Sequence, residues 1–267
     1  MKYVTYQADA GPRVGFLDGD TVVDAGFDGD MVAFIEAGAP VSAGSPIPSA
    51  VLLAPLRPRT LRDFLTFEGH LKNAFAGLGK AIPNEWYTVP AYYKGLPDTV
   101  IGPDAEIPWP SYTDRLDHEL ELAVVIGTAG KDIAAERALD HVFGYTIWND
   151  MSARDTQQRE LPVGMGPCKA KDWDGSNILG PCIVTPDELD IRDALGIADR
   201  ADMAAMAMAL PEADSALGYI ASRRAALADG SVVRIDLTGP VVRTYVIGVV
   251  DGRGHLLEGH DREPDVT

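Results

Sequence analysis

Polar and hydrophobic residues alternate most regularly in the segment HELELAVVIG, which runs from His118 to Gly127. Alternation with a period of two places successive side chains on opposite faces of a β-strand. Segments rich in β-branched and aromatic residues predict further strands along the chain. The clearest of them are HVFGYTIWN (141–149), PCIVTP (181–186), SVVRIDLTG (231–239) and VVRTYVIGVV (241–250). The chain is therefore predicted to fold around a β core.

The N-terminal part of the chain predicts short strands joined by turns. Asp18-Gly19 stands between two β-favouring runs, which is a hairpin signal. The proline-rich stretch PIPSAVLLAPLRPRT (46–60) then predicts a stiff connector. We therefore expect a small N-terminal β domain, residues 1–58, and a larger domain, residues 59–267.

Helices are expected at fewer places than strands. The segment LRDFLTFEGHLKNAF (61–75) has apolar residues three or four positions apart, which is the spacing of one helix face. A second helical pattern, DMSARDTQQRE (150–160), directly follows a predicted strand. Helices are also expected near residues 132–140 and in the alanine-rich stretch 191–229, and the tail 260–267 is expected to fray. A β core with peripheral helices indicates an α+β fold that is mostly β.

Two glutamates share one face of the central predicted strand. Glu119 and Glu121 are two residues apart, which is about 7 Å along a strand, and the strand continues into apolar residues. Two like charges on a half-buried face are costly unless a cation or protons neutralise them. The alternative is an edge strand whose polar end is solvated, and the strand by itself leaves both interpretations open.

Other polar residues have spacings that place them near one another. Asp150, Arg154 and Gln157 fall at positions i, i+4 and i+7, which predicts one helix face. The alternative for Asp150 is a helix N-cap that forms an ion pair with Arg154. Asp63 and His70 are also seven residues apart in a predicted helix. The alternative for His70 is a core histidine packed among aromatic side chains.

Charge narrows the possible functions. The chain has 267 residues, with 23 lysines and arginines against 40 aspartates and glutamates, so its formal net charge is −17. Such a charge repels phosphate backbones and anionic lipid surfaces, and we therefore expect neither nucleic acid nor a membrane as a partner. Excess carboxylate instead suits hard cations. Three or four carboxylates at one point are the arrangement that Mg²⁺, Mn²⁺ or Ca²⁺ prefers.

The cysteines and the apolar segments indicate the cellular compartment in which the protein is expected. Cys168 and Cys182 are the only cysteines, and their spacing excludes a zinc ribbon and a disulfide-built scaffold. No apolar stretch follows the N-terminal lysine, so we expect no signal peptide. Apolar runs such as residues 122–127 are shorter than the roughly 20 residues that cross a bilayer. A cytoplasmic protein is therefore expected.

Five segments, in this order, resemble the fumarylacetoacetate hydrolase (FAH) family. They are DFLTFEGH, YYKG, ELELAVVIG, GYTIWNDMSARDTQ and KDWDGSNILGP, and they look like the bacterial enzymes with a short fumarylacetoacetase-type domain. The resemblance covers roughly residues 61–190. It is most specific where the ELE strand and NDMSARDTQ occur together in this order. The resemblance implies a distorted β-roll core, a small N-terminal β domain, a homodimer and an active-site Mg²⁺ or related ion.

The resemblance also implies roles for individual residues. The residues that match the family's metal ligands are Asp63, Glu119, Glu121 and Asp150. His70 corresponds to the general base that activates a water. Lys171 corresponds to a lysine that stabilises developing negative charge, and Arg154 adds a second positive charge. The positions that match substrate contacts are Tyr93, Arg154, Gln157 and Lys171.

The reaction implied by the resemblance is hydrolysis of a carbon–carbon bond in a β-diketone or acylpyruvate-type 2-oxo acid. Paired substrate oxygens chelate the metal, a water activated by His70 adds to the carbonyl carbon, and an enolate leaves. Cations stabilise that enolate. The same site would suit decarboxylation of a 3-oxo acid such as oxaloacetate, which needs no water.

The C-terminal part departs from the family pattern. Family members carry a glycine-rich TGTPxGxG-type segment, of which this chain has only Thr238-Gly239-Pro240. No C-terminal glutamate stands out as a partner of His70, and Glu68 is badly placed for that role on an ideal helix. These departures leave a diverged reaction open, such as isomerisation, dehydration or cyclisation of an oxo compound. A catalytically silent homologue that only binds is the further alternative.

Overall fold

The computed structural model describes most of the first 189 residues and four strands beyond them. The described ranges are 1–42, 44–66, 68–77 and 79–189, with β14 (Tyr219–Ala221), β15 (Ser231–Asp236), β16 (Arg243–Val250) and β17 (Leu256–Gly259). β15 and β16 confirm the two strands expected near the C-terminal end, and β17 adds a third strand to their sheet.

Other sequence predictions concern the part of the chain after residue 189. β14 contradicts the helix expected over residues 191–229 at the place that it occupies. The rest of that stretch lies outside the described residues. So do the Thr238-Gly239-Pro240 sequence and the tail 260–267.

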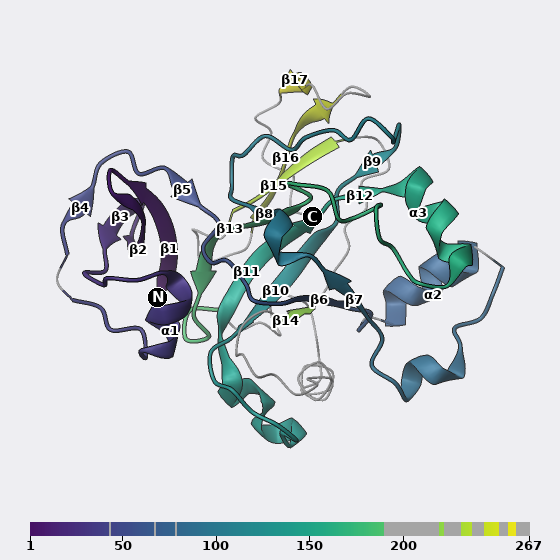
Figure 1. Cartoon of the computed structure of the whole chain (residues 1–267), viewed down its shortest axis with the longest axis horizontal. Helices are drawn as coiled ribbons and strands as arrows, with labels where there is room; N and C mark the ends of the chain where they lie inside the picture. The colour runs from purple at the N-terminus through teal and green to yellow at the C-terminus, as the bar shows by residue number, and fades with distance from the viewer. Residues whose placement is uncertain are drawn as a thin grey trace.

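One twelve-stranded sheet runs through the described part of the chain (Figure 1). Its strands follow the order β4–β3–β2–β1–β13–β11–β10–β14–β6–β7, with β5 paired to β1 and β8 paired to β13. The N-terminal strands are β1 (Lys2–Ala8), β2 (Gly11–Asp18), β3 (Thr21–Asp24), β4 (Pro46–Ile47) and β5 (Leu52–Leu53). The later strands are β6 (Leu61–Phe64), β7 (Tyr92–Gly95), β8 (Val100–Ile101), β10 (Leu120–Ile126), β11 (Val142–Asp150) and β13 (Asn177–Val184). This arrangement confirms the mostly β, α+β fold class.

The helices are short and lie outside the sheet. They are α1 (Met31–Glu36), α2 (Glu68–Gly77), α3 (Arg154–Glu160) and the 3-10 helices η1 (Asn84–Tyr87), η2 (Pro97–Thr99), η3 (Ala135–His141) and η4 (Leu161–Val163). η3 confirms the short helix expected near residues 132–140. In Figure 1, α2 and α3 are drawn on the right, on the side away from the N-terminal strands.

The N-terminal strands form the hairpin that the sequence predicted. β2 and β3 pair up to Asp18 and Thr21, and Gly19 supplies the left-handed backbone that the turn requires, at φ +58°. β1 also pairs with β13, through Tyr3 and Ile183. The N-terminal unit is therefore attached to the main sheet by a strand ladder. Its division from the rest at residue 58 stays a prediction.

The segment 61–75 is not one helix, as the apolar spacing predicted. Its first four residues form β6, which pairs with β7 on one side and β14 on the other, and α2 begins only at Glu68. Leu61 and Phe64 are both buried, and pairing along both edges of this strand outweighs a weak helical preference. Asp63 therefore projects from a strand. The prediction that Asp63 and His70 share a helix face is wrong.

Asp150 closes strand β11 and does not belong to a helix. The residues after it form the short strand β12 (Ser152–Ala153), which pairs with β9 (Leu116–Asp117). α3 begins after β12, and its N-cap residue is Ala153. The expected helix face therefore holds Arg154 and Gln157 but not Asp150, and Asp150 does not cap the helix.

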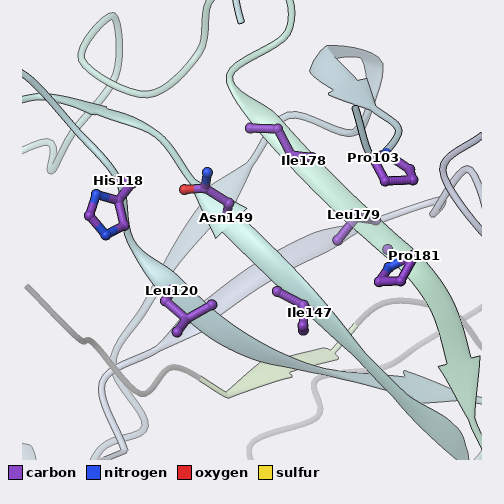
Figure 2. Close-up of a pocket in the computed structure, with 9 residues that line it drawn as sticks. Pro103, His118, Leu120, Ile147, Asn149, Ile178, Leu179 and Pro181 are labelled. Carbon is purple, nitrogen blue, oxygen red and sulfur yellow. The ribbon is translucent and has the colours of Figure 1, made fainter. Parts of the chain in front are cut away.

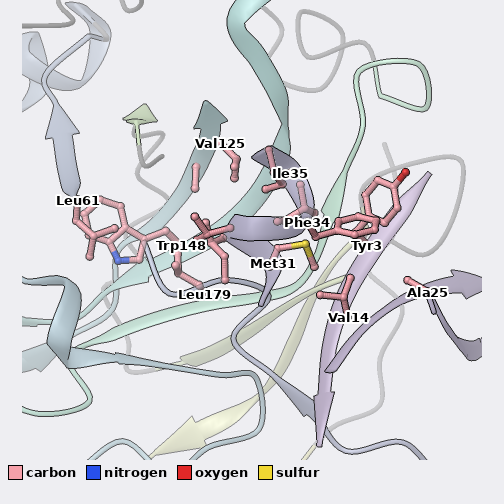
Figure 3. Close-up of a cluster of buried hydrophobic side chains, with 14 residues drawn as sticks. Tyr3, Val14, Ala25, Met31, Phe34, Ile35, Leu61, Val125, Trp148 and Leu179 are labelled. Atoms are coloured by element: carbon pink, nitrogen blue, oxygen red, sulfur yellow. The ribbon is translucent and has the colours of Figure 1, made fainter. Parts of the chain in front are cut away.

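A buried apolar cluster joins the N-terminal strands to the central ones (Figure 3). Tyr3 and Phe34 contribute aromatic rings from the N-terminal side, with centroids 5.2 Å apart. Trp148 and Leu179 contribute from β11 and β13. Burial of such large side chains stabilises the fold by about 1.5–3 kcal/mol each. The burial of Trp148 in this cluster holds strand β11, which ends at Asp150, against the core.

A buried chain of hydrogen bonds anchors the backbone of Lys171. Trp148 Nε1 donates to Asn177 Oδ1 at 2.7 Å, and Asn177 Nδ2 donates to Thr99 Oγ1 at 2.6 Å. Asn177 Nδ2 also lies 3.1 Å from Ser176 Oγ, which donates to the carbonyl oxygen of Lys171 at 2.6 Å. Buried polar groups are costly unless paired. The chain of bonds therefore holds the backbone of Lys171 in a defined place.

None of the helices in the described part of the chain has the length and hydrophobicity needed to cross a membrane.

Candidate metal centre

Three strands bring four carboxylates to one place. Glu119 directly precedes β10, Glu121 lies within it, and Asp150 ends the neighbouring strand β11, where Asp150 N donates to Glu119 O at 3.0 Å. Asp63 comes from β6, on the other side of β14. Each carboxylate offers an oxygen, and these oxygens all lie within 4.8 Å of one another.

The two glutamates share one face of the strand, as alternation predicted, and the structure shows that they are buried. Glu119 is 5% exposed and Glu121 is 3% exposed. β10 pairs with β11 on one edge and β14 on the other. The alternative of an edge strand with a solvated polar end is therefore wrong.

Two cationic side chains, from the buried Lys171 and the partly buried Arg154, contact the carboxylates. Lys171 Nζ lies 2.7 Å from Glu119 Oε2 and forms a second ion pair with Asp150 Oδ2. Arg154 Nη2 lies 2.5 Å from Glu119 Oε1, and Arg154 Nε lies 2.7 Å from Asp117 Oδ2. Each oxygen of Glu119 thus faces one positive charge. Glu121 has no comparable ion pair among the contacts that the structure describes.

The carboxylates differ in proton affinity as a result. Burial alone would raise the pKa of Glu119, but Lys171 and Arg154 outweigh burial and lower it below its usual value. Burial, reinforced by the charges of Asp63 and Asp150, raises the pKa of Glu121 well above its usual value. Burial, only partly offset by Lys171, raises the pKa of Asp150 to about 8. Without a further cation, Asp150 therefore holds a proton near neutral pH, and the proton affinity of Glu121 is shifted in the same direction.

A dependence of stability on pH follows for the metal-free protein. In the unfolded chain Asp150 releases its proton near pH 4, whereas in the folded chain it keeps the proton to about pH 8. The pKa of Glu121 is raised in the same direction. Folding therefore binds protons between these values, and stability falls as the pH rises through this window. Glu119, whose pKa is lowered, contributes to the pH dependence of stability only below this pH window.

We expect Asp150 to lower the free energy of unfolding in EDTA by about 3 kcal/mol between pH 5 and pH 8, and Glu121 to add to this fall. Urea unfolding at a series of pH values measures this change. Millimolar Mg²⁺ should reduce the fall, because a bound cation replaces the protons. A metal-free stability that rises over the same range would contradict the assigned pKa directions.

The donor set fits one divalent cation. Every donor is a carboxylate oxygen, the ligand that Mg²⁺, Mn²⁺ and Ca²⁺ prefer. Glu121 Oε2 and Asp150 Oδ1 are buried and have no hydrogen-bond partner among the residues that the structure describes. When all four carboxylates are ionised, Lys171 and Arg154 leave at least two of their negative charges uncompensated. One divalent cation would balance that charge and use the unpaired oxygens.

The other sequence-predicted site residues lie at different distances from the cluster. Tyr93 is the cross-strand neighbour of Asp63, and its ring centroid lies 5.7 Å from Lys171 Nζ. Gln157 Oε1 accepts a hydrogen bond from Arg154 Nη1 at 2.8 Å. His70 belongs to α2, and its side chain lies outside the described part of the structure.

An apolar hollow lies on the opposite face of the same strands (Figure 2). His118 and Leu120 line it, and they alternate along the chain with Glu119 and Glu121. Asn149 lines it from the neighbouring strand. The hollow is therefore separate from the acidic cluster, and His118 lines the hollow and not the cluster.

Sequence reasoning missed two aspartates beside the site. Asp117 pairs with Arg154, and the alternation that placed Glu119 and Glu121 on one face also placed Asp117 there. Asp172 accepts a hydrogen bond from the hydroxyl of Tyr93. Burial, with this hydrogen bond second, raises the pKa of Tyr93. These two residues are 79 positions apart, and no local pattern could have paired them.

Known proteins share both sequence and fold with this chain. The family model described as Fumarylacetoacetate (FAA) hydrolase C-terminal matches residues 59–207. The mitochondrial oxaloacetate tautomerase fahd2 of Xenopus laevis is 39% identical over 108 residues, which cover 40% of this chain and 33% of that protein. Matches to two uncharacterized Pyrococcus proteins cover only about half of each.

Solved structures with this fold include two hydrolases. Fumarylacetoacetate hydrolase from Exiguobacterium antarcticum superposes with a TM-score of 0.59 at 29% identity, covering 72% of this chain and 69% of that one. Maleylpyruvate hydrolase from Sphingobium sp. SYK-6, in complex with manganese(II) and pyruvate, has a TM-score of 0.58 at 21% identity and covers 86% and 92%, which shows the fold alone. The family model spans more than half of the chain, and the strand arrangement agrees with it. The chain belongs to the fumarylacetoacetate hydrolase family of enzymes.

Proposed function

We propose that this protein is a divalent-metal-dependent hydrolase that cleaves a carbon–carbon bond in a β-diketone or acylpyruvate-type 2-oxo acid. The observation that carries the proposal is the buried cluster of Asp63, Glu119, Glu121 and Asp150 with Lys171 at its side. So much buried negative charge is costly for folding. A cation-dependent function explains why the chain keeps it.

The four carboxylates would hold Mg²⁺, with Mn²⁺ or Ca²⁺ as alternatives. Their oxygen-only donor set supports this assignment. The bound ion would supply Lewis-acid polarisation of a substrate carbonyl. The manganese in maleylpyruvate hydrolase supports a divalent ion in a protein of this fold.

The chain's own residues would manage charge and protons. His70 would take a proton from water, so that the oxygen can add to the carbonyl carbon. The carbon–carbon bond then breaks, and its electron pair passes to the departing fragment as an enolate, which is protonated to the ketone. Lys171 lies buried beside the carboxylates and would stabilise the developing oxyanion. Tyr93, Arg154 and Gln157 would orient the substrate.

A second candidate reaction is keto–enol tautomerisation of a 2-oxo acid. It is favoured by the 39% identity to an oxaloacetate tautomerase. This reaction passes through the same enolate, because a proton leaves carbon and another is added to oxygen or carbon. It needs no water as a reactant, so the role of His70 separates it from hydrolysis.

The test is turnover of acylpyruvates and of enol-oxaloacetate, each followed by ultraviolet absorbance, with Mg²⁺, Mn²⁺ or EDTA. We expect acylpyruvate cleavage that depends on the metal. Glu119→Ala and Asp150→Ala should lose metal binding and activity. His70→Ala should keep metal binding and lose hydrolysis, and the exposed Asp20→Ala is the matched control.

The outcomes separate the candidates. Metal-dependent loss of enol-oxaloacetate without acylpyruvate cleavage would favour the tautomerase. Full activity of His70→Ala would refute its role in activating water. Absence of turnover with any metal would favour a binding homologue. The homodimer remains a prediction that sedimentation of the same preparation would check.

A further inference from the structure

Asp117 lies beside the candidate metal centre, where Arg154 links it to Glu119. Asp117, Glu119 and Glu121 occupy alternating positions, and β9 ends at Asp117 just before β10 begins. Neither the sequence motifs nor the proposed reaction gives Asp117 a role. Its side chain is 28% exposed, against 6% for Glu119. Asp117 therefore stands at the outer rim of the acidic face.

Arg154 bridges this outer carboxylate and the inner one. Arg154 Nε lies 2.7 Å from Asp117 Oδ2, and Nη2 lies 2.5 Å from Glu119 Oε1. Nη1 donates to Gln157 Oε1 at 2.8 Å. The side chain is only 14% exposed. All three nitrogens of the guanidinium are thus engaged, and its charge is shared between two carboxylates.

The backbone holds both ends of this bridge in register. β9 pairs with β12, with Asp117 opposite Ser152. Arg154 N donates to the carbonyl oxygen of Arg115 at 2.8 Å. Backbone hydrogen bonds therefore hold the segments that carry Asp117 and Arg154 together, independently of the ion pair between their side chains. Such an arrangement makes the ion pair preorganised and not a chance surface contact.

The shared charge has a consequence for Glu119. A guanidinium held by one carboxylate alone would bind that carboxylate more tightly. Because Asp117 takes part of the charge of Arg154, Glu119 keeps more of its own charge for another cation. We infer that Asp117 is a positioning residue that acts through Arg154 to keep Glu119 available to a divalent cation. This inference rests on the proposed metal centre.

The test is Mn²⁺ affinity, measured from the electron paramagnetic resonance signal of free Mn²⁺ with the full chain. Asp117→Asn should weaken Mn²⁺ binding about tenfold. Arg154→Gln should strengthen it, because a competing cation is removed. In the Arg154→Gln background, Asp117→Asn should change the affinity by less than about twofold. Circular dichroism checks that each variant is folded.

Two further variants keep the test decisive. Asp117→Glu preserves the charge and should restore binding to within about threefold of the unaltered protein, even if Asp117→Asn folds poorly. Asp140 forms an exposed ion pair with Arg137 at 2.7 Å, and Asp140→Asn is the matched control, with unchanged affinity expected.

The outcomes distinguish this inference from the proposed function. If Asp117→Asn weakens binding equally in both backgrounds, Asp117 acts as a nearby charge and the role through Arg154 is overturned. If Asp117→Asn lowers only thermal stability and leaves the affinity unchanged, the role is structural and the inference fails. If the unaltered protein binds no Mn²⁺, the proposed metal centre itself fails, and the inference with it.

Discussion

Replacing Glu121 with glutamine is expected to make the metal-free protein more stable while abolishing its binding of divalent cations. Glu121 is buried, its pKa is raised by burial and by the neighbouring acids, and its Oε2 has no hydrogen-bond partner among the described residues. Glutamine removes the charge at nearly the same volume. The gain in unfolding free energy should be about 1–2 kcal/mol in EDTA at pH 8.

Thermal unfolding with and without Mg²⁺ measures this prediction. The unaltered protein should melt higher with Mg²⁺, because a ligand that binds only the folded state stabilises it. The Glu121→Gln variant should have the same melting temperature with and without Mg²⁺. Glu36 forms an exposed pair with Arg59 at 2.8 Å, so Glu36→Gln is the matched control and should keep the Mg²⁺ effect. A variant that is less stable in EDTA than the unaltered protein would contradict the claim that crowded negative charge destabilises the metal-free fold.

Replacing Lys171 with methionine is expected to have the opposite effect on the metal-free protein. Lys171 is 3% exposed and forms ion pairs with Glu119 and Asp150. Burial alone would lower the pKa of Lys171, but the surrounding carboxylates outweigh burial and raise it. Removing one partner of a buried ion pair costs about 3–5 kcal/mol. The variant should therefore become stable only with a divalent cation.

The same variant separates metal binding from chemistry. Removal of a positive charge from the cluster should strengthen Mn²⁺ binding about tenfold. Turnover should fall about 10²- to 10³-fold, because the developing oxyanion loses a donor. Calorimetric titration and initial rates measure the two quantities.

Lys169 lies two residues away, and its Nζ sits 4.1 Å from the ring centroid of Tyr112, on the protein surface. Lys169→Met is therefore the matched control, and it should change neither quantity. Weaker Mn²⁺ binding in Lys171→Met would show that the lysine supports the ion and does not compete with it.

The central strands and the pair of glutamates could be predicted from the sequence because they depend on a local pattern. The alternation around Glu119 and Glu121 fixes one shared face whatever the rest of the fold does. The hairpin at Asp18-Gly19 was predictable for the same reason, since turn chemistry is local. Both features were confirmed.

The local conformation around Asp63 could not be predicted in this way. Apolar residues near Leu61 have helical spacing, but β7 and β14 supply strand partners that lie about 30 and 160 residues further along the chain. Tertiary pairing of this kind overrides local preference. Asp63 nevertheless reaches the acidic cluster. The resemblance to a family therefore placed this residue where periodicity had assigned it the wrong element.

The bridging role of Arg154 shows a second limit of sequence reasoning. Spacing paired Arg154 with Asp150, because the two are four residues apart. The structure pairs it with Asp117 and Glu119, because β12 interrupts the expected helix. A short strand of two residues has almost no sequence signature. Its partner β9 becomes visible only in the folded chain.

The central claim is that four buried carboxylates hold one divalent cation. Diffraction from crystals grown with Mn²⁺, recorded at the manganese absorption edge, tests it most directly. The account predicts one anomalous peak for each chain, within bonding distance of oxygens from Asp63, Glu119, Glu121 and Asp150. A map with no peak there, or with Lys171 Nζ filling the space between the carboxylates at saturating Mn²⁺, would contradict it.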